Sequence, residues 1–221
     1  MSGFTVFQTQ IKNINDDIIQ HYEENLEQSY LNIQHRGNDG HYVIEKAINN
    51  QFILMSHNNL LIDKENKKGI QPFETDEFLL VVDGRFYQYE KIAQKEGFIL
   101  KTKTNCEFLL HLYKKYGVKC LDFLQGEFAF ALYDKVRNVW FCARDRFGIR
   151  PFHYYLFDHK FIASSEAKGI IPFINKVEID KQALAFSQYY QYLPTDKSLF
   201  ENIYQLPPAH YLLIENNNFN P

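Results

Sequence analysis

The chain of 221 residues lacks the local signatures of several large enzyme classes. It has no GxxxxGK phosphate-binding loop, no HExxH zinc motif, no pair of CxxC motifs and no GxSxG serine elbow. These absences exclude P-loop NTPases, zincins, zinc ribbons and hydrolases with a GxSxG nucleophile elbow. No apolar run approaches the roughly 18 residues of a membrane span, and the N-terminus lacks the basic and apolar regions of a signal peptide. We therefore expect a protein that is neither secreted nor embedded in a membrane.

Cysteine and net charge are also scarce. The three cysteines, Cys106, Cys120 and Cys142, stand singly within apolar stretches and show neither metal-ligand spacing nor an even disulfide framework. This usage favours a reduced, cytoplasmic compartment and predicts no metal site. The net charge is only -3, so no field of one sign argues for nucleic acid or anionic lipid as a partner.

Apolar and aromatic residues, by contrast, are abundant. The composition is 45% hydrophobic, with 20 Phe and 15 Tyr, which is typical of a globular protein with a sizeable core. We find no internal repeat, and we interpret the charged stretch 63–76 as a loop rather than a linker. Residues 1–215 are expected to form one domain. The Asn-rich tail 216–221 is typical of the start of a linker in a longer chain.

Hydrophobic periodicity predicts an α+β protein. Strands are expected at 4–8, 41–45, 52–56, 78–82, 127–133, 139–143, 152–157, 161–163 and 210–214. Helices are expected at 16–31, 89–95, 107–116, 166–170 and 181–190, with glycines ending the second and third. The segments 127–133 and 139–143 form a hairpin, in which Phe128, Phe130 and Leu132 share one face. Runs of strands with helices between them favour layered α+β architecture over a parallel α/β sheet.

Three polar segments stand out, and each has a plain structural interpretation beside a functional one. Asp83-Gly84-Arg85 follows a strand, where sites often form, but it could equally be a turn. Residues 143–151 carry four charges around a glycine, for which an internal ion-pair network is favoured over catalysis. His35 at a helix end is favoured as a dipole-capping residue over a base or a phosphate contact. Residue types and spacing alone support only a soluble α+β domain.

Taken in order, further motifs resemble the N-terminal domain of asparagine synthetases and other class II glutamine amidotransferases. The family's opening Met-Cys-Gly-Ile, its His-Arg-Gly-Pro-Asp and its Asn-Gly-Glu-Ile-Tyr-Asn-Tyr are similar to residues 1–4, 35–39 and 83–89. Its later signatures are similar to residues 126–134, 143–151, 163–168 and 206–211. The resemblance covers nearly the whole chain. It implies a four-layer αββα sandwich of the N-terminal-nucleophile hydrolase type, in which removal of Met1 exposes the nucleophile.

The same resemblance implies that the glutamine site is degenerate. The nucleophilic cysteine is replaced by Ser2, a far weaker nucleophile at neutral pH. The asparagine that shares the oxyanion hole with a following glycine is replaced by Asp83, before Gly84. The substrate-binding positions change too, because the arginine that holds the glutamine carboxylate corresponds to Asn59, and the two acids facing its ammonium correspond to Arg85 and Asn105.

The function implied by this resemblance is that of a glutaminase-inactive amidotransferase domain. It would support an ATP-dependent, amide-forming synthetase domain on the same or a separate chain, as in the β-lactam synthetases and lasso-peptide cyclases, which likewise lack the cysteine. ATP and magnesium are expected only on that synthetase domain, and no cofactor on this one. Two alternatives stay open: a repurposed serine amidohydrolase, with Ser2 as nucleophile and the freed α-amine as base, and a stand-alone binding module. A homodimer is also left open.

Overall fold

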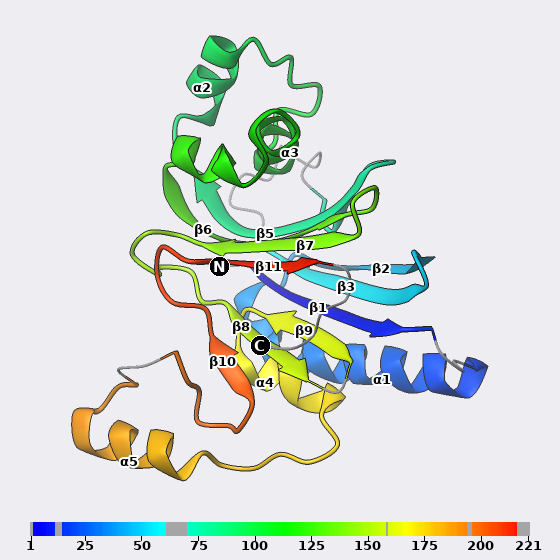
Figure 1. The fold of residues 1–221 in the computed structure, drawn as a ribbon, viewed down its shortest axis with the longest axis vertical. Coiled ribbons are helices and arrows are strands. Elements are labelled where there is room, and N and C mark those ends of the chain that lie inside the picture. The colour runs from blue at the N-terminus through cyan, green and yellow to red at the C-terminus, as the bar shows by residue number, and fades with distance from the viewer. Residues whose placement is uncertain (1, 12–14, 61–69, 158, 194–195, 216–221) are drawn as a thin grey trace.

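The chain folds into four layers, with two antiparallel sheets packed face to face and helices on both outer faces (Figure 1). The computed structural model describes residues 2–11, 15–60, 70–157, 159–193 and 196–215. The expected removal of Met1 and the linker expected at 216–221 therefore concern residues outside this set. The αββα layering that the family resemblance implied is confirmed.

The first sheet has six strands in the order β10-β8-β9-β1-β3-β2. They span β1 (Gly3–Gln10), β2 (Gly40–Ile48), β3 (Gln51–Asn59), β8 (His153–Phe157), β9 (Lys160–Ser164) and β10 (Ile203–Gln205). The N-terminal strand β1 lies inside the sheet, paired with β3 on one side and β9 on the other. Its register places Gly3 opposite Asn58, so Ser2 arrives where β3 ends.

The second sheet has five strands in the order β11-β7-β6-β5-β4. They span β4 (Phe73–Glu74), β5 (Phe78–Phe86), β6 (Gly126–Asp134), β7 (Val139–Arg144) and β11 (Tyr211–Glu215). The expected hairpin is confirmed as β6 and β7, which pair from Ala129 and Arg144 to Asp134 and Val139. Strand β5 pairs with the other side of β6, so Asp83 lies opposite Ala129 and Arg85 lies opposite Glu127.

The period-two alternation of the strands divides the interior into a central core and two outer cores. On β6, Ala129, Ala131 and Tyr133 enter the core between the sheets, while Phe128, Phe130 and Leu132 face the opposite way, as expected. On β5, Leu79 and Val81 face the space between the sheets. Asp83 and Arg85 continue this alternation toward the strand's end, which directs them to the same side.

Helices cover the outer faces of both sheets. Helices α1 (Asp16–Ile33) and α4 (Ala167–Ile170) lie on the six-stranded sheet, and α2 (Tyr89–Glu96) and α3 (Asn105–Tyr116) lie on the five-stranded sheet (Figure 1). Helix α5 (Lys181–Tyr190) stands away from both sheets (Figure 1). In the described part of the chain, 3-10 turns span η1 (Gln34–Arg36), η3 (Gly117–Phe123) and η4 (Ile171–Phe173). Within the described residues, no helix is long and apolar enough to cross a membrane.

Local side-chain contacts set the ends of the helices. The Asn15 side chain accepts a hydrogen bond from the Ile18 N–H, and the Thr104 hydroxyl accepts one from the Glu107 N–H, so each helix start has the capping residue that it prefers. Gly97 and Gly117 end α2 and α3 as expected. Helix α1 ends at Ile33 and continues into the 3-10 turn that carries His35 and Arg36.

The sequence analysis missed two short strands. Strand β4 lies inside the stretch expected to be a loop, whose residues 63–69 fall outside the described part of the chain. Strand β10 was also not expected. Each has only two or three residues, and each exists because a neighbouring strand supplies its hydrogen bonds: β5 pairs with β4 and β8 pairs with β10. Strands of this length are too short to show a period-two pattern of apolar and polar residues in the sequence.

Candidate functional site

The candidate site lies between the two sheets, where β1 begins and where β3 and β5 end. Ser2 precedes β1, and its hydroxyl accepts a hydrogen bond from the Leu60 backbone N–H at 3.2 Å. Asn59, at the end of β3, is the neighbour of Leu60 and is only 7% exposed. The antiparallel pairing of β1 and β3 therefore brings the two predicted positions Ser2 and Asn59 together.

Arg36 connects Ser2 with the opposite sheet. Its Nε donates to the Ser2 carbonyl oxygen at 3.0 Å, and its Nη2 donates to Asp83 Oδ2 at 2.8 Å. Its third contact is a hydrogen bond from Nη1 to Glu166 Oε1 at 3.1 Å. The guanidinium is only 7% exposed, so these contacts form largely out of solvent and are stronger than surface pairs. Through Arg36, the structure places Ser2 and Asp83 at one site.

Asp83 is bound by two arginines. Its Oδ2 accepts the hydrogen bond from Arg36, and its Oδ1 lies 3.5 Å from Arg150 Nη1. Arg150 also donates from Nη2 to Glu127 Oε1 at 3.0 Å. Complete burial raises the pKa of the Asp83 carboxyl above its ordinary value, and the charges of Arg36 and Arg150 oppose that shift. Two guanidinium groups at this range favour the ionised carboxylate, which can accept hydrogen bonds but cannot donate one.

Glu166 closes the other side of this cluster. Its Oε1 accepts from Arg36 and lies 2.8 Å from His35 Nε2, and its Oε2 pairs with Lys168 at 3.2 Å. Burial alone would raise the pKa of Glu166, but the hydrogen bonds from Arg36, His35 and Lys168 outweigh it and hold the pKa below its usual range. His35 thus contacts a carboxylate as well as standing at a helix end. No contact with a nucleophile is found for His35 among the described residues.

Gly84 and Asn105 approach each other from different elements. Asn105 is the first residue of α3, and its Nδ2 lies 3.5 Å from the Gly84 carbonyl oxygen, at the outer limit of a hydrogen bond. Gly84 has a φ of +129°, and a Cβ at this position would lie 2.0 Å from the Glu127 carbonyl oxygen. Only glycine therefore allows β5 and β6 to approach this closely at the edge of the site.

Arg85 is the only added cation among the predicted substrate positions. Its side chain is exposed, and within the described residues it forms no ion pair. Glu127 lies directly opposite it on β6, but the Glu127 carboxylate is bound to Arg150. The structure thus gathers all six predicted positions, Ser2, Asn59, Asp83, Gly84, Arg85 and Asn105, at one end of the sandwich.

The segment 143–151 differs in part from the expected ion-pair network. Arg150 does join such a network, with Asp83 and Glu127. Arg144 instead donates to three backbone carbonyls, those of Gly148, Arg150 and Leu206, each at 2.7 Å. Asp145 accepts backbone N–H groups from Phe128, Phe147, Ile149 and Arg150. These two residues satisfy buried backbone groups of the loop, and this loop in turn positions Arg150.

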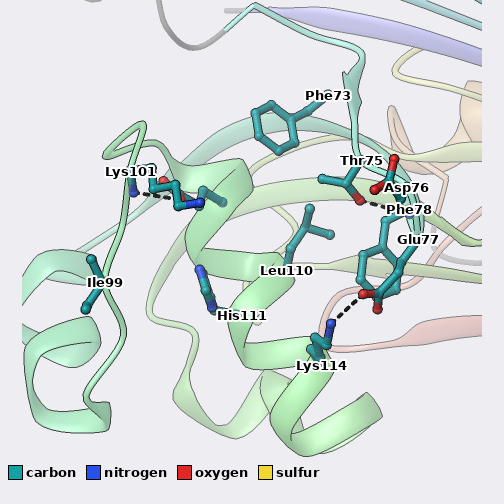
Figure 2. A pocket seen from close by; sticks show the side chains of 11 residues that line it. Phe73, Thr75, Asp76, Glu77, Phe78, Ile99, Lys101, Leu110, His111 and Lys114 are labelled. Atoms are coloured by element: carbon teal, nitrogen blue, oxygen red, sulfur yellow. Dashed lines mark hydrogen bonds and ion pairs between the residues drawn. The ribbon is translucent and has the colours of Figure 1, made fainter.

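A separate hollow lies on the outer side of the five-stranded sheet. It has a volume of about 320 Å³ and lies between the β4–β5 turn and α3, with Phe73, Phe78 and Leu110 among its lining residues (Figure 2). Figure 2 shows Lys114 paired with Glu77 at its rim. The Glu107 carboxylate accepts backbone N–H groups from residues 101–103. Much of the charge in this hollow is already neutralised, so it offers weaker chemistry than the cluster around Asp83.

Comparison with known proteins gives one family match. The family model described as "Glutamine amidotransferase domain" matches residues 10–221. A putative glutamine-hydrolyzing asparagine synthetase 2 of Methanocaldococcus jannaschii is 32% identical over 83% of this chain and 39% of its own length. The amidase chry2 of Gibberella zeae is 32% identical over 92% of this chain and 30% of its own length. Asparagine synthetase 1 of Bacillus subtilis is 30% identical over 87% of this chain and 30% of its own length.

Solved structures agree on the fold. The glutamine phosphoribosylpyrophosphate amidotransferase of B. subtilis covers 98% of this chain with a TM-score of 0.63, at 15% sequence identity and over 47% of its own length. At this identity the likeness concerns the fold, which is that of the N-terminal-nucleophile hydrolases. The chain spans only 30% to 39% of the length of the three curated relatives above.

Proposed function

The chain belongs to the glutamine amidotransferase domain family, and from that premise we propose that it is a member that no longer hydrolyses glutamine. The observation that carries this proposal is the position of Asp83. In the family resemblance this position supplies an oxyanion donor, and here it holds a carboxylate that is bound to Arg36 and Arg150. A carboxylate cannot donate to a developing oxyanion and repels it. Losing one such donor costs about 3 to 4 kcal/mol of transition-state stabilisation.

The substrate-binding positions support the same proposal. A free amino acid such as glutamine needs a cation for its α-carboxylate and acids for its α-ammonium. Asn59 offers no charge to the carboxylate, Asn105 offers none to the ammonium, and Arg85 adds a cation near the place of the ammonium. The positive charge of Arg85 would repel the α-ammonium of glutamine and weaken its binding. The pocket therefore no longer fits the amino-acid zwitterion.

Ser2 is weakened as a nucleophile by its chemistry and by its contact. A hydroxyl supplies essentially no alkoxide at neutral pH, whereas a thiol supplies some thiolate. The hydroxyl oxygen of Ser2 accepts the Leu60 N–H, and this bond occupies one of the lone pairs that an attacking oxygen would use. Within the described residues, no imidazole or carboxylate contacts this hydroxyl in the manner of a general base.

The proposal gives the domain a supporting role beside a synthetase. Several relatives are named glutamine-hydrolyzing asparagine synthetases and are about three times as long as the matched region. We place ATP, magnesium and amide-bond formation on such a synthetase domain, on the same or a separate chain. The amidotransferase-like domain then acts as a structural partner of the synthetase domain.

A second candidate is an amidohydrolase that uses Ser2 on another substrate. Two relatives named amidases, from Gibberella zeae and Penicillium rubens, are 32% and 30% identical to this chain. This similarity supports amide hydrolysis as the second candidate activity. This candidate requires a free α-amine on Ser2, so N-terminal sequencing of the purified protein tests its first condition.

Glutamate release from glutamine tests the proposed function directly. The purified chain with its authentic N-terminus is compared with a boiled sample and with asparagine synthetase 1 of B. subtilis as the positive control. We expect no release above the boiled sample. Turnover of about 1 per second or faster, as in ordinary enzymes, would overturn the inactive-domain proposal. Release of ammonia from simple acyl amides, without release from glutamine, would favour the second candidate.

A further inference from the structure

Helix α5 and its flanks expose an apolar, aromatic surface. Between Lys181 and Asp196 the sequence contains no charged residue, although 23% of the whole chain is charged. We call the exposed side chains of this region the α5 surface: Val177, Ile179, Leu184, Tyr189, Tyr190, Tyr192 and Leu199. Tyr189 is 81% exposed and Tyr192 is 62% exposed. Soluble domains rarely leave so many large apolar side chains together in solvent without a use for them.

The rest of the protein does not cover this helix. Ala183 is its one fully buried residue among those described, and Figure 1 shows α5 standing clear of both sheets. It is fastened at its first turn, where Asp180 accepts the N–H groups of Gln182 and Ala183 and pairs with Lys197 at 2.9 Å. The flank is held by an isolated bridge between Ile179 and Phe200. The helix is thus fixed in place at one end while its apolar face stays open.

The aromatic rings of α5 contact one another instead of the core. Tyr189 and Tyr190 meet edge to face with centroids 4.8 Å apart, and Phe186 and Tyr192 each lie 6.1 Å from Tyr190. A helix of ten residues is marginal in water without tertiary packing. Tyrosine and phenylalanine are enriched, and charged residues depleted, at the centres of protein interfaces. Composition and geometry therefore both indicate a surface that is buried in an assembly.

The lengths of the relatives indicate what covers this surface. In the three relatives described above, 61% to 70% of the chain lies outside the matched region, and two of them are named asparagine synthetases. An amidotransferase region inside such a protein has a large neighbour to pack against. We propose that the α5 surface is the docking site for an ATP-dependent synthetase domain. This inference rests on the proposed supporting role and adds the residues through which that role is exercised.

Site-specific photo-crosslinking in the source organism tests the assignment. The photoreactive residue p-benzoylphenylalanine replaces Tyr189 on the α5 surface, Phe147 in the β7–β8 loop, or Ile99 after α2, one at a time in the full natural chain. All three side chains are more than 80% exposed, so their accessibility is matched. We expect the residue at position 189 to form an adduct with a synthetase sequence, on a separate polypeptide or on the continuation of this chain. Position 99 should form none.

Substitutions on the surface provide the second measurement. Leu184→Ser together with Tyr192→Ser should lower the adduct yield at position 189 by about tenfold or more, because apolar anchors dominate interface energy. Both side chains are exposed, so thermal unfolding of the chain should not change. Tyr87→Ser, at a 50% exposed tyrosine outside the α5 surface, is the matched control and should leave the yield unchanged.

The possible outcomes distinguish the assignment of the α5 surface from the proposed supporting role beside a synthetase. A synthetase adduct at position 147 but not at 189 would overturn the α5 assignment and keep the synthetase partner. An adduct at 189 with a second copy of the chain, or with a protein that contains no synthetase sequence, would overturn the proposal. Absence of any synthetase adduct at all three positions would overturn both the surface and the supporting role. Glutamate release is measured separately and decides the loss of hydrolysis in every case.

Discussion

The carboxylate of Asp83 and the guanidinium of Arg36 form a buried ion pair at 2.8 Å that joins the two sheets of the sandwich. Asp83 belongs to β5 of one sheet, whereas Arg36 follows α1, the helix packed on the other. Arg36 is 7% exposed and the Asp83 side chain is 1% exposed, so neither charge has water to compensate for a lost partner. Asp83, at the position where we propose that an oxyanion donor was lost, is thereby part of the buried interior.

Asp83→Asn should therefore destabilise the protein, even though it restores the family's residue. It leaves Arg36 and Arg150 facing each other with no anion between them, and breaking a buried pair costs about 3 kcal/mol or more. Urea denaturation of the variant and the wild type measures this loss. Asp122→Asn, at an exposed aspartate, is the control and should cost less than about 0.5 kcal/mol.

A double-mutant cycle tests whether the stability lost in Asp83→Asn comes from the charge of the arginines or from the changed shape of the side chain. Arg150→Gln removes one of the two cations, so combining it with Asp83→Asn should recover part of the stability lost by the single change. If Asp83→Asn alone proves as stable as the wild type, the ion pair is not structural, and our account of this cluster is wrong.

Ser2→Cys alone should not restore glutaminase activity. The thiol repairs the nucleophile, but glutamine would still lack a cation for its carboxylate, acids for its ammonium and an oxyanion donor. Each defect is worth about 2 to 4 kcal/mol, so even two of them suppress turnover by roughly a thousandfold. Glutamate release by Ser2→Cys is compared with that by Ser2→Ala, and we expect the two to be equal.

The combined reversal should do far more than the single change. Asn59→Arg, Asp83→Asn, Arg85→Glu and Asn105→Asp are added to Ser2→Cys, and the fold is checked first because Asp83→Asn costs stability. Efficient hydrolysis by Ser2→Cys alone would mean that the other four positions are not the substrate pocket.

Lowering the pH should destabilise the fold through His57. Burial lowers the pKa of His57 to about 4, against an ordinary value of 6.5. Between these values the unfolded chain binds a proton that the folded protein does not bind, so the free energy of unfolding falls as the pH falls. The loss between pH 7.5 and pH 5 is about 2 kcal/mol. Urea denaturation at both pH values should show this difference shrinking in His57→Gln.

The control for this pH effect is His21→Gln, at an exposed histidine of α1. It should leave the pH dependence of stability as in the wild type. An unchanged pH dependence in His57→Gln would instead assign the acid sensitivity to other groups, of which half-buried His153, whose pKa desolvation also lowers to about 4, is the first to test.

Gly84→Ala should be among the most damaging single changes. Its φ is +129°, and the added Cβ would lie 2.0 Å from the Glu127 carbonyl oxygen, so β5 or β6 must move. We expect a loss of about 3 kcal/mol or more. Gly97→Ala is the matched control, because its φ is also positive, at +74°, but no atom lies within 4 Å of the new Cβ. It should cost only about 1 kcal/mol in thermal or urea unfolding.

The sequence predicted most of the fold because strands and helices of ordinary length show their own periodicity. The nine expected strands and five expected helices all form, with ends shifted by no more than four residues. Strands β4 and β10 could not be predicted, because backbone pairing with β5 and β8 creates them. The αββα layers followed from the family resemblance, since periodicity gives elements but not their stacking.

The candidate site was only partly predictable. The five substituted positions stood out against the family pattern, yet nothing local in the sequence pairs Asp83 with Arg36 or with Arg150. These contacts join residues far apart in the chain, and the chain contains 24 lysines and arginines among which sequence cannot choose. Glu166 was likewise missed as the partner of both His35 and Arg36, for which the only signal was its place in the matched segment 163–168.

The pairing of Asp83 with two arginines also constrains the evolutionary history of the protein. A lineage that reverts position 83 first passes through a form in which Arg36 and Arg150 keep Glu166 and Glu127 but lose the carboxylate between them, and the lost stability counts against that form before any activity returns. A lineage that neutralises Arg150 first leaves Glu127 without its partner and gains no catalysis. On the proposed function, a first step back at either of these two positions is therefore costly or without benefit, which makes the proposed loss of glutamine hydrolysis hard to reverse.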